Sequence, residues 1–145
     1  MRITTKSRKR QRGQAAVESA LIMLVFLPVL IGIMDFGQFL YFHQSLAERA
    51  RAAARYGAVH TYTDGSDSAK VAVYNDPAGT TNGATQLLPN LTTGIVSATL
   101  SGAGTDDARI TVTISNYPYN FISPFMSKST WFRTLRASEP YEIGH

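Results

Sequence analysis

The residues whose types and spacing could support chemistry lie near the start of the chain, at Gly13 and Glu18. A peptidase needs unhindered backbone at the bond that it cuts, and glycine has no side chain to obstruct it. The bond between Gly13 and Gln14 is therefore a candidate cleavage site, at which this chain would be the substrate of another enzyme. Glu18 adds a carboxylate beside an apolar run, where an unpaired charge is costly.

Both residues also have a simpler interpretation. Gly13 can be an incidental glycine before a membrane anchor. Glu18 can be an interfacial glutamate, favoured near a helix N-terminus by the helix dipole alone.

A basic segment and an apolar segment enclose these residues. Residues 1–13 hold six of the 14 basic residues and no acid, and Ser19–Met34 contains no charge. A helix over residues 19–42 would be about 36 Å long, enough to cross a hydrocarbon core of about 30 Å. Because basic residues stay in the cytoplasm, the N-terminus is expected inside and the C-terminal part outside. No small-residue cleavage site follows Met34, so processing is expected before the span, with the apolar helix retained.

The rest of the sequence offers little for catalysis. The chain has no cysteine. Without residues 1–13 it has 8 basic residues against 10 acidic ones, so the excess of basic charge lies in residues 1–13. Beside an apolar segment this excess predicts membrane topology and not nucleic-acid binding. His43, His60 and His145 lack the spacing of metal ligands. Asp106 and Asp107 are expected in a turn. We therefore predict no enzyme activity, no catalytic residue, no cofactor and no metal.

A long helix is expected to carry the candidate site. It should occupy residues 14–57 after a disordered leader, residues 1–13, with a kink at Pro28 and a C-cap at Gly57. Its second half is amphipathic. The apolar or small residues of its one face are Phe36, Phe39, Leu40, His43, Leu46, Ala47, Ala50, Ala53, Ala54 and Gly57.

Residues 58–145 predict a small extracytoplasmic α+β domain. A short helix is expected through Tyr74, capped within residues 66–68 and ended by Pro77. Strands are expected at residues 95–100 and 108–116, as an antiparallel hairpin whose Ile110, Val112 and Ile114 pack on the long helix. The other expected elements are loops at residues 76–83 and 120–126 and a third strand at residues 130–137. The fold class is thus α+β, with a long transmembrane and amphipathic helix before a small antiparallel β domain.

Two further features allow alternatives. Asp35 marks the outer end of the span, or it is an intramembrane partner for a basic residue of another subunit. The aromatic residues Tyr117, Tyr119, Phe121 and Phe125 are core or subunit contacts, or an adhesive surface.

The segment R-G-Q-A-A-V-E-S-A-L resembles a prepilin site, with glycine at the last leader position and glutamate at the fifth mature position. With the Ala/Arg-rich stretch of residues 47–58, it resembles the TadE-like proteins, minor pseudopilins of tight-adherence (Flp-type) pilus systems. Ser19 departs from the apolar residue common there. The resemblance implies a bacterial inner-membrane protein, cleavage after Gly13 by a prepilin peptidase, and pairing of Glu18 with the new amine of Gln14 in a neighbouring subunit. Its implied partners are other pilin-like subunits, the pilus assembly machinery and the lipid bilayer.

Three functions compete. The first is a minor pseudopilin in assembly of a tight-adherence pilus or a related secretion filament. The second is a signal-anchored exported domain that binds cell-envelope material without a filament role. The third, a membrane-tethered enzyme, has the least support, because no catalytic arrangement stands out after Gly57.

Overall fold

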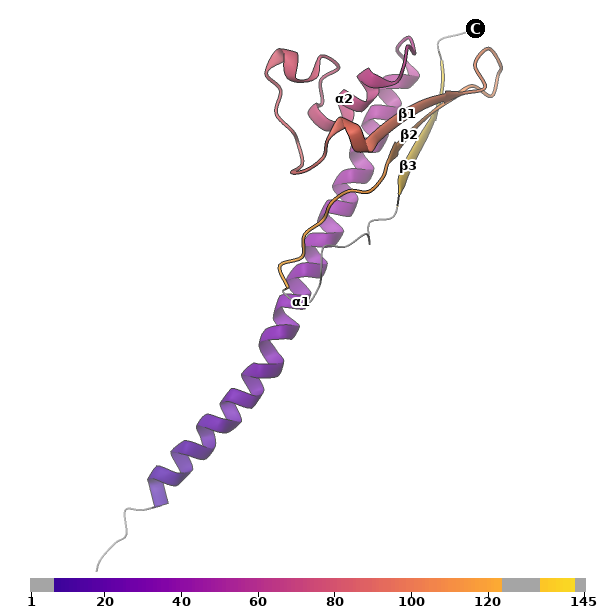
Figure 1. Ribbon diagram of the computed structural model, residues 1–145. Coiled ribbons are helices and arrows are strands. Elements are labelled where there is room, and N and C mark those ends of the chain that lie inside the picture. Colours follow the sequence, from indigo (N-terminus) through magenta and orange to yellow (C-terminus); the bar gives the residue numbers. More distant parts are fainter. Residues whose placement is uncertain (1–6, 124–133, 143–145) are drawn as a thin grey trace, which may run out of the picture.

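The computed structural model describes residues 7–123 and 134–142, without the side chains of residues 7–12, 81 and 82. It contains two α-helices, α1 (Ser7–Ala58) and α2 (Ser66–Tyr74), and three strands, β1 (Val96–Ser101), β2 (Arg109–Ile114) and β3 (Leu135–Pro140). Short 3-10 turns lie at Gly79–Asn82 and Thr93–Ile95. Figure 1 shows that the smaller elements gather around the upper end of α1, while the lower end stands alone. The predicted α+β fold is confirmed.

Helix α1 is longer than predicted at both ends. It begins at Ser7, so the expectation of a disordered leader is wrong for residues 7–13. Arg, Lys and Gln are good helix formers, and a helix already nucleated in the apolar run extends one residue at a time. It also continues through Pro28 and ends at Ala58.

Gly57 is therefore not the C-cap. It lies inside α1, where an added Cβ would collide with the side chains of Ile110 and Ser68. The glycine allows the sheet and α2 to approach the helix closely, which is a packing role and not a terminating one.

The three strands form one antiparallel sheet in the order β1-β2-β3. The predicted hairpin is confirmed within two residues at each end. The third strand is displaced: residues 130–133 of the predicted strand lie outside the described residues, and β3 covers Leu135–Pro140. Pairing with β2 decides its register, because Leu135 lies opposite Ile114 and Ala137 opposite Val112.

The core lies between the sheet, α2 and the upper half of α1. Ile110 and Val112 are fully buried and Ile114 is 2% exposed, as the alternation predicts. Val112 and Ile114 belong to one core cluster with side chains of α1, of which Leu46, Ala53 and Ala54 are fully buried. The side chain of Ile110 lies against Gly57. The predicted helix face is correct from Leu46 upward.

Lower on α1, the predicted face is wrong at two positions. Phe36 and Leu40 are 62% and 42% exposed. The packed side there consists of Asp35, Phe39 and Phe42. The contacts of Asp35 fix which side of this part of the helix is covered.

Helix α2 covers the predicted residues, but its capping residues differ from the predicted ones. Its N-cap is Gly65 in the left-handed region, with no side-chain cap, and its C-cap is Asn75 at φ 59°. The backbone N–H of Asn75 donates to the carbonyl of Val71. The helix thus ends at Tyr74, three residues before Pro77.

Candidate processing and membrane-anchoring site

Gly13 and Gln14 lie on the exposed lower part of α1. Both are exposed, and an added Cβ at Gly13 would meet no atom within 4 Å. The fold therefore does not require glycine at this position. In the helix the candidate scissile bond is not extended. A peptidase would have to unwind this turn, and glycine lowers that cost by about 1 kcal/mol relative to alanine.

Glu18 follows one turn later on the same side of the helix, because residues four apart are neighbours on an α-helix. Its side chain is exposed, and it forms no ion pair with another residue that the structure describes. The sequence-predicted residues are thus brought onto one exposed strip of α1.

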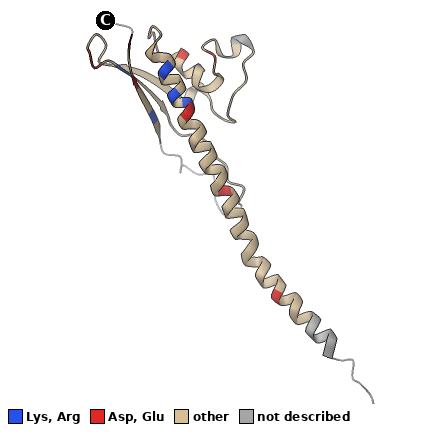
Figure 2. Cartoon of the chain, turned by 180° about the vertical axis from the view of Figure 1, so that it is seen from behind, with Lys and Arg blue, Asp and Glu red and all other residues tan. Residues whose placement is uncertain are grey.

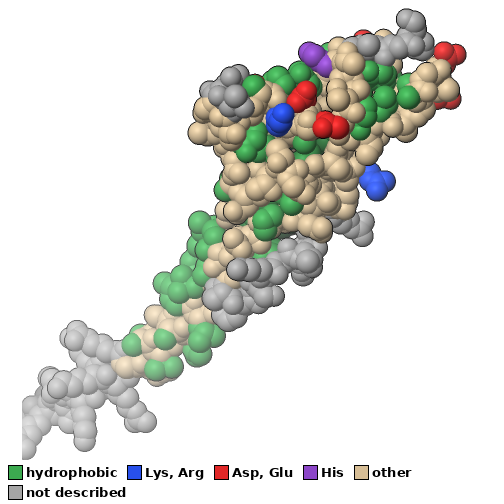
Figure 3. Space-filling view, turned by 45° about the horizontal axis from the view of Figure 1, so that its top comes forward, with side chains coloured by type: hydrophobic (Ala, Val, Ile, Leu, Met, Phe, Trp, Pro, Cys, Tyr) green, Lys and Arg blue, Asp and Glu red, His purple; other side chains and the backbone are tan. Residues whose placement is uncertain are grey.

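The helix above Glu18 is apolar on all sides. We call residues 13–34 of α1 the stalk. Twelve large hydrophobic residues along it, Val17, Leu21–Leu27, Val29, Leu30, Ile33 and Met34, are 41–70% exposed, and Ile31 is half-buried. The most apolar 18-residue window has a mean hydropathy of 2.4 and no buried residue. By length and composition, this helix is able to cross a membrane. Figure 3 shows hydrophobic side chains along the visible face of this part of the molecule.

Asp35 ends the stalk and is buried, with 3% of its surface exposed. Its carboxylate accepts two consecutive backbone N–H groups: Oδ1 from Ile122 at 2.7 Å and Oδ2 from Ser123 at 2.9 Å. Consecutive amides of a bent backbone form a concavity suited to an anion. The side chain therefore fixes a segment 87 residues away in sequence onto the helix.

We call this segment, Tyr117–Ser123, the foot. Figure 1 shows the chain after β2 running back down beside α1. Phe39 and Phe42 on the helix meet the ring of Tyr119 at centroid distances of 5.8 and 5.5 Å, and the ring of Phe121 meets it at 4.9 Å. The core interpretation of this aromatic cluster is confirmed for Tyr117, Tyr119 and Phe121, while Phe125 lies outside the described residues.

Two tyrosines of the foot have altered acidity. Burial raises the pKa of Tyr117, whose hydroxyl donates to the carbonyl of Pro89 at 2.7 Å. Burial, followed by the charge of Asp35, raises the pKa of Tyr119. Because the pKa of each is raised, both phenols stay neutral to a higher pH than a tyrosine in water.

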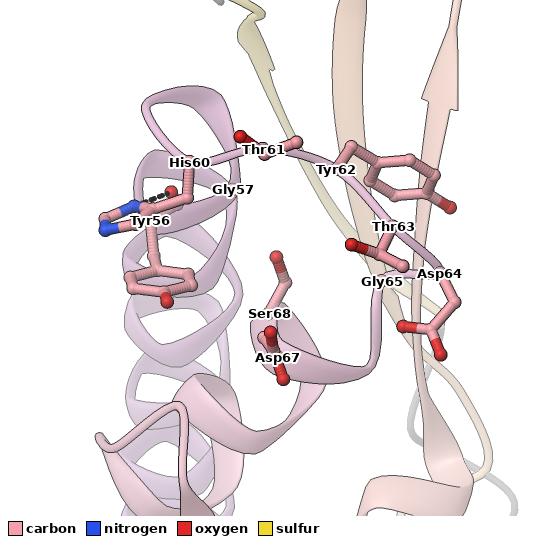
Figure 4. Close-up of a pocket in the computed structure, with 10 residues that line it drawn as sticks. All are labelled: Tyr56, Gly57, His60, Thr61, Tyr62, Thr63, Asp64, Gly65, Asp67 and Ser68. Carbon is pink, nitrogen blue, oxygen red and sulfur yellow. Dashed lines mark hydrogen bonds between the residues drawn. The ribbon is translucent and has the colours of Figure 1, made fainter.

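The other end of the molecule has a polar hollow of about 270 Å³ between the end of α1 and the start of α2. Figure 4 shows its lining, with the ring of His60 stacked on Tyr56. Its ionisable groups have local partners. His60 Nδ1 contacts the carbonyl of Tyr56 at 2.8 Å, and Asp67 pairs with Lys70 at 3.0 Å. Hydrogen bonds from Ser66, first from its hydroxyl and then from its backbone N–H, lower the pKa of Asp64.

No group of three or more metal-ligating side chains occurs among the described residues. Asp106 and Asp107 lie in a turn, as predicted. His145 lies outside the described residues.

Above residue 12, the basic residues of α1 all lie at its upper end, at Arg49, Arg51 and Arg55. Figure 2 shows these blue positions grouped there, with isolated red positions of acidic residues below. Arg55 lies 3.9 Å from Glu139 of β3, with most of its side chain exposed. Such an exposed pair contributes little to stability, about 0–1 kcal/mol.

Sequence reasoning did not identify the binding role of Asp35. Its two proposed roles, a boundary marker and a partner for another subunit's base, did not include backbone amides of its own chain. One signal was present: Asp35 is the only charged residue from Ser19 to Ala47. The sequence gives no signal for the position of its partner, because nothing in it places Ile122 beside Asp35.

Fold and site together define a class of protein that is built on a long apolar helix. The candidate processing residues lie at the free end of this helix, and a small α+β domain packs on its other end. Residues 13–55, which lie within α1, match the family model of TadE-like proteins, and this match confirms the resemblance seen in the sequence. No curated protein and no solved structure was found to match the chain. The family supports a role associated with Tad/Flp-type pili and with their assembly components.

Proposed function

We propose that this chain is a minor pseudopilin of a tight-adherence pilus or a related secretion system. A prepilin peptidase would remove residues 1–13, and the stalk would remain as a single-pass anchor in the bacterial inner membrane. The observation that carries the proposal is the coincidence, on one exposed apolar helix, of the TadE-like match with the Gly13–Glu18 spacing.

The surroundings of Gly13 support a processing role. Since no neighbouring atom restricts this position, packing gives no reason for a glycine. Gly32 provides a matched control, because it lies in the same helix and an added Cβ there also meets nothing within 4 Å. Any difference between alanine at the two positions therefore reports on recognition by another protein.

Processing is tested by the intact mass of the protein from its native host. The mature chain should begin at Gln14, without the six basic residues of the leader. Gly13→Ala should block or strongly slow this cleavage, whereas Gly32→Ala should be cleaved normally. A mature chain that keeps residues 1–13, or one cut after Met34, would contradict the proposal.

Glu18 supports a role in assembly. Its exposed carboxylate lies where the helix is expected to meet hydrocarbon, and cleavage would create an amine one turn away at Gln14. Pairing of that amine with Glu18 of a neighbouring subunit would lower the cost of packing the helices together. The proposed partners are thus the peptidase, other pilin-like subunits, the assembly machinery and the lipid bilayer.

The orientation is part of the proposal. The excess of basic residues before the stalk predicts a cytoplasmic N-terminus and a domain outside the cytoplasmic membrane. Protease added to spheroplasts should digest a tag placed after His145. A tag that stays protected, while a tag on a known external protein is digested, would reverse the orientation.

A structural role, without enzyme activity, is the remaining part of the proposal. It is supported by the local pairing of His60, Asp64 and Asp67 in the polar hollow. The alternative, an exported domain that binds envelope material without a filament role, predicts that Gly13 and Glu18 variants leave its function unchanged.

A further inference from the structure

We propose that the foot lies in the boundary between headgroups and acyl chains of the bilayer leaflet next to the domain, where Ile122 contacts lipid and Asp35 holds the segment in place. This inference rests on the proposed function only in requiring that the stalk spans a bilayer. Its ligand is the lipid itself.

The first support is the distribution of charge. Asp35 is the only charged residue of α1 from Ser19 to Ala47, and it is buried. The described chain from Ile110 to Ser123 contains no charged residue. A domain surface in water normally carries charges of both signs. Here both segments at the base of the domain lack them on their exposed surfaces, which suits contact with lipid.

The second support is length. Exposed apolar side chains continue from Val17 to Tyr41. As a helix these 25 residues span about 37 Å, which exceeds a hydrocarbon core of about 30 Å and falls within the 40–45 Å that includes the headgroups. The upper residues of this surface, Phe36, Leu40 and Tyr41, therefore reach the interfacial region. Tyrosine is enriched at this depth in membrane proteins.

The third support is the position of Ile122 along the axis of α1. Its backbone N–H is bonded to Asp35, so it lies at the level of the helix where the interface is expected. Its side chain is 57% exposed, like that of Phe36 at 62%. The exposed apolar surface of the stalk thus continues onto a second segment at this level.

Asp35 makes this position possible for the foot. Free backbone N–H groups are costly in a region with little water, and the turn at Ile122 and Ser123 presents two of them. The carboxylate accepts both, and its own charge is in turn stabilised by them. Asp35 is therefore a positioning residue for the lipid contact.

The absence of cysteine makes the test direct, because one introduced cysteine carries the only label. The full chain, with a fluorescent label at Ile122→Cys, is reconstituted in phosphatidylcholine vesicles. Val25→Cys in the stalk and Ala103→Cys at the exposed β1–β2 loop serve as controls. Quenching is measured with aqueous iodide and with lipids carrying a spin label near the headgroup or deep in the acyl chain.

We expect the label at position 122 to be quenched by the shallow spin-labelled lipid and protected from iodide. The label at position 25 should respond to the deep lipid, and the label at position 103 to iodide alone. Iodide quenching at position 122 equal to that at 103 would overturn the proposal. So would protection at 122 from both quenchers, since another protein surface would then cover it.

Two further results separate this inference from the proposed anchor. If lipid quenching is absent at position 122 but present at position 25, only the interfacial position of the foot is contradicted. If it is absent at position 25, the membrane anchor itself is contradicted. In Asp35→Asn, an NH2 group replaces one carboxylate oxygen, so one of the two backbone N–H groups of the foot loses its acceptor. The label at 122 should then lose lipid quenching and gain iodide quenching, while Glu48→Gln should change neither. An unchanged response in Asp35→Asn would overturn the role of Asp35.

Discussion

The lower and upper parts of α1 belong to one continuous helix and present opposite surfaces. Leu24 in the stalk is 70% exposed, while Leu46 in the upper half is fully buried under the sheet and α2. Both parts are helical, so the secondary structure itself does not explain the difference. The upper half has Ala50, Ala53 and Ala54 on one face, which lets other elements approach, whereas the stalk has bulky side chains all round. Residue size and pattern thus assign one part to the domain and the other to lipid or other helices.

The largest effect that separates the two parts is expected at Glu18. In Glu18→Ala the freed amine of Gln14 would enter the helix bundle without its counter-charge. An unpaired buried charge costs about 3–5 kcal/mol, a factor of several hundred or more in association. Membrane insertion should survive, because the span becomes more apolar. Crosslinking of the cleaved variant to its partner subunits, together with filament counts, measures the loss.

Glu48→Ala is the control, since Glu48 is an exposed glutamate on the upper half of the same helix. It should assemble normally. If Glu18→Ala also assembles normally, Glu18 is only an interfacial residue. If it is left uncleaved, the same measurement assigns Glu18 to recognition by the peptidase and not to assembly.

The next effect concerns stability and uses the two leucines. Leu46→Ala removes a fully buried side chain from the core and should lower the free energy of unfolding by about 2–5 kcal/mol. Leu24→Ala removes the same atoms from the stalk and should leave domain stability nearly unchanged. Thermal unfolding of both variants in one detergent, followed by far-UV and near-UV circular dichroism, compares them. Equal losses would show that the stalk and the domain unfold as one unit.

The sequence predicts the elements well where one local pattern decides the structure. The alternation of Ile110, Val112 and Ile114 predicts β2, and the uncharged run from Ser19 to Met34 predicts most of the stalk. It predicts less well where a distant partner decides. The register of β3 depends on β2, the role of Gly57 depends on Ile110, and the burial of Asp35 depends on the foot. The candidate processing residues, Gly13 and Glu18, are predicted from sequence alone because recognition by another protein would depend on local spacing.

The smallest effect tests how firmly the foot belongs to the domain. Tyr117 is 4% exposed, and its hydroxyl donates to the carbonyl of Pro89. Tyr117→Phe keeps the ring and removes this hydrogen bond, which should lower the free energy of unfolding by about 1 kcal/mol. Tyr41→Phe is the control, because that ring is 63% exposed and should tolerate the change.

The pH dependence of stability sharpens the same test. Because burial raises the pKa of Tyr117 above its ordinary value of 10.0, the unfolded chain releases this proton at lower pH than the folded one. The stabilisation is therefore complete below about pH 10 and is lost as the pH rises through the folded-state pKa. Tyr117→Phe should make the alkaline decline in the unfolding temperature shallower, with Tyr119 contributing the remainder, and Tyr41→Phe should keep the full decline. If all three proteins decline equally between pH 9 and 11, a range chosen to bracket the ordinary tyrosine value of about 10, Tyr117 ionises as freely in the folded chain as in water. In that case the upper end of the foot does not stay packed in solution.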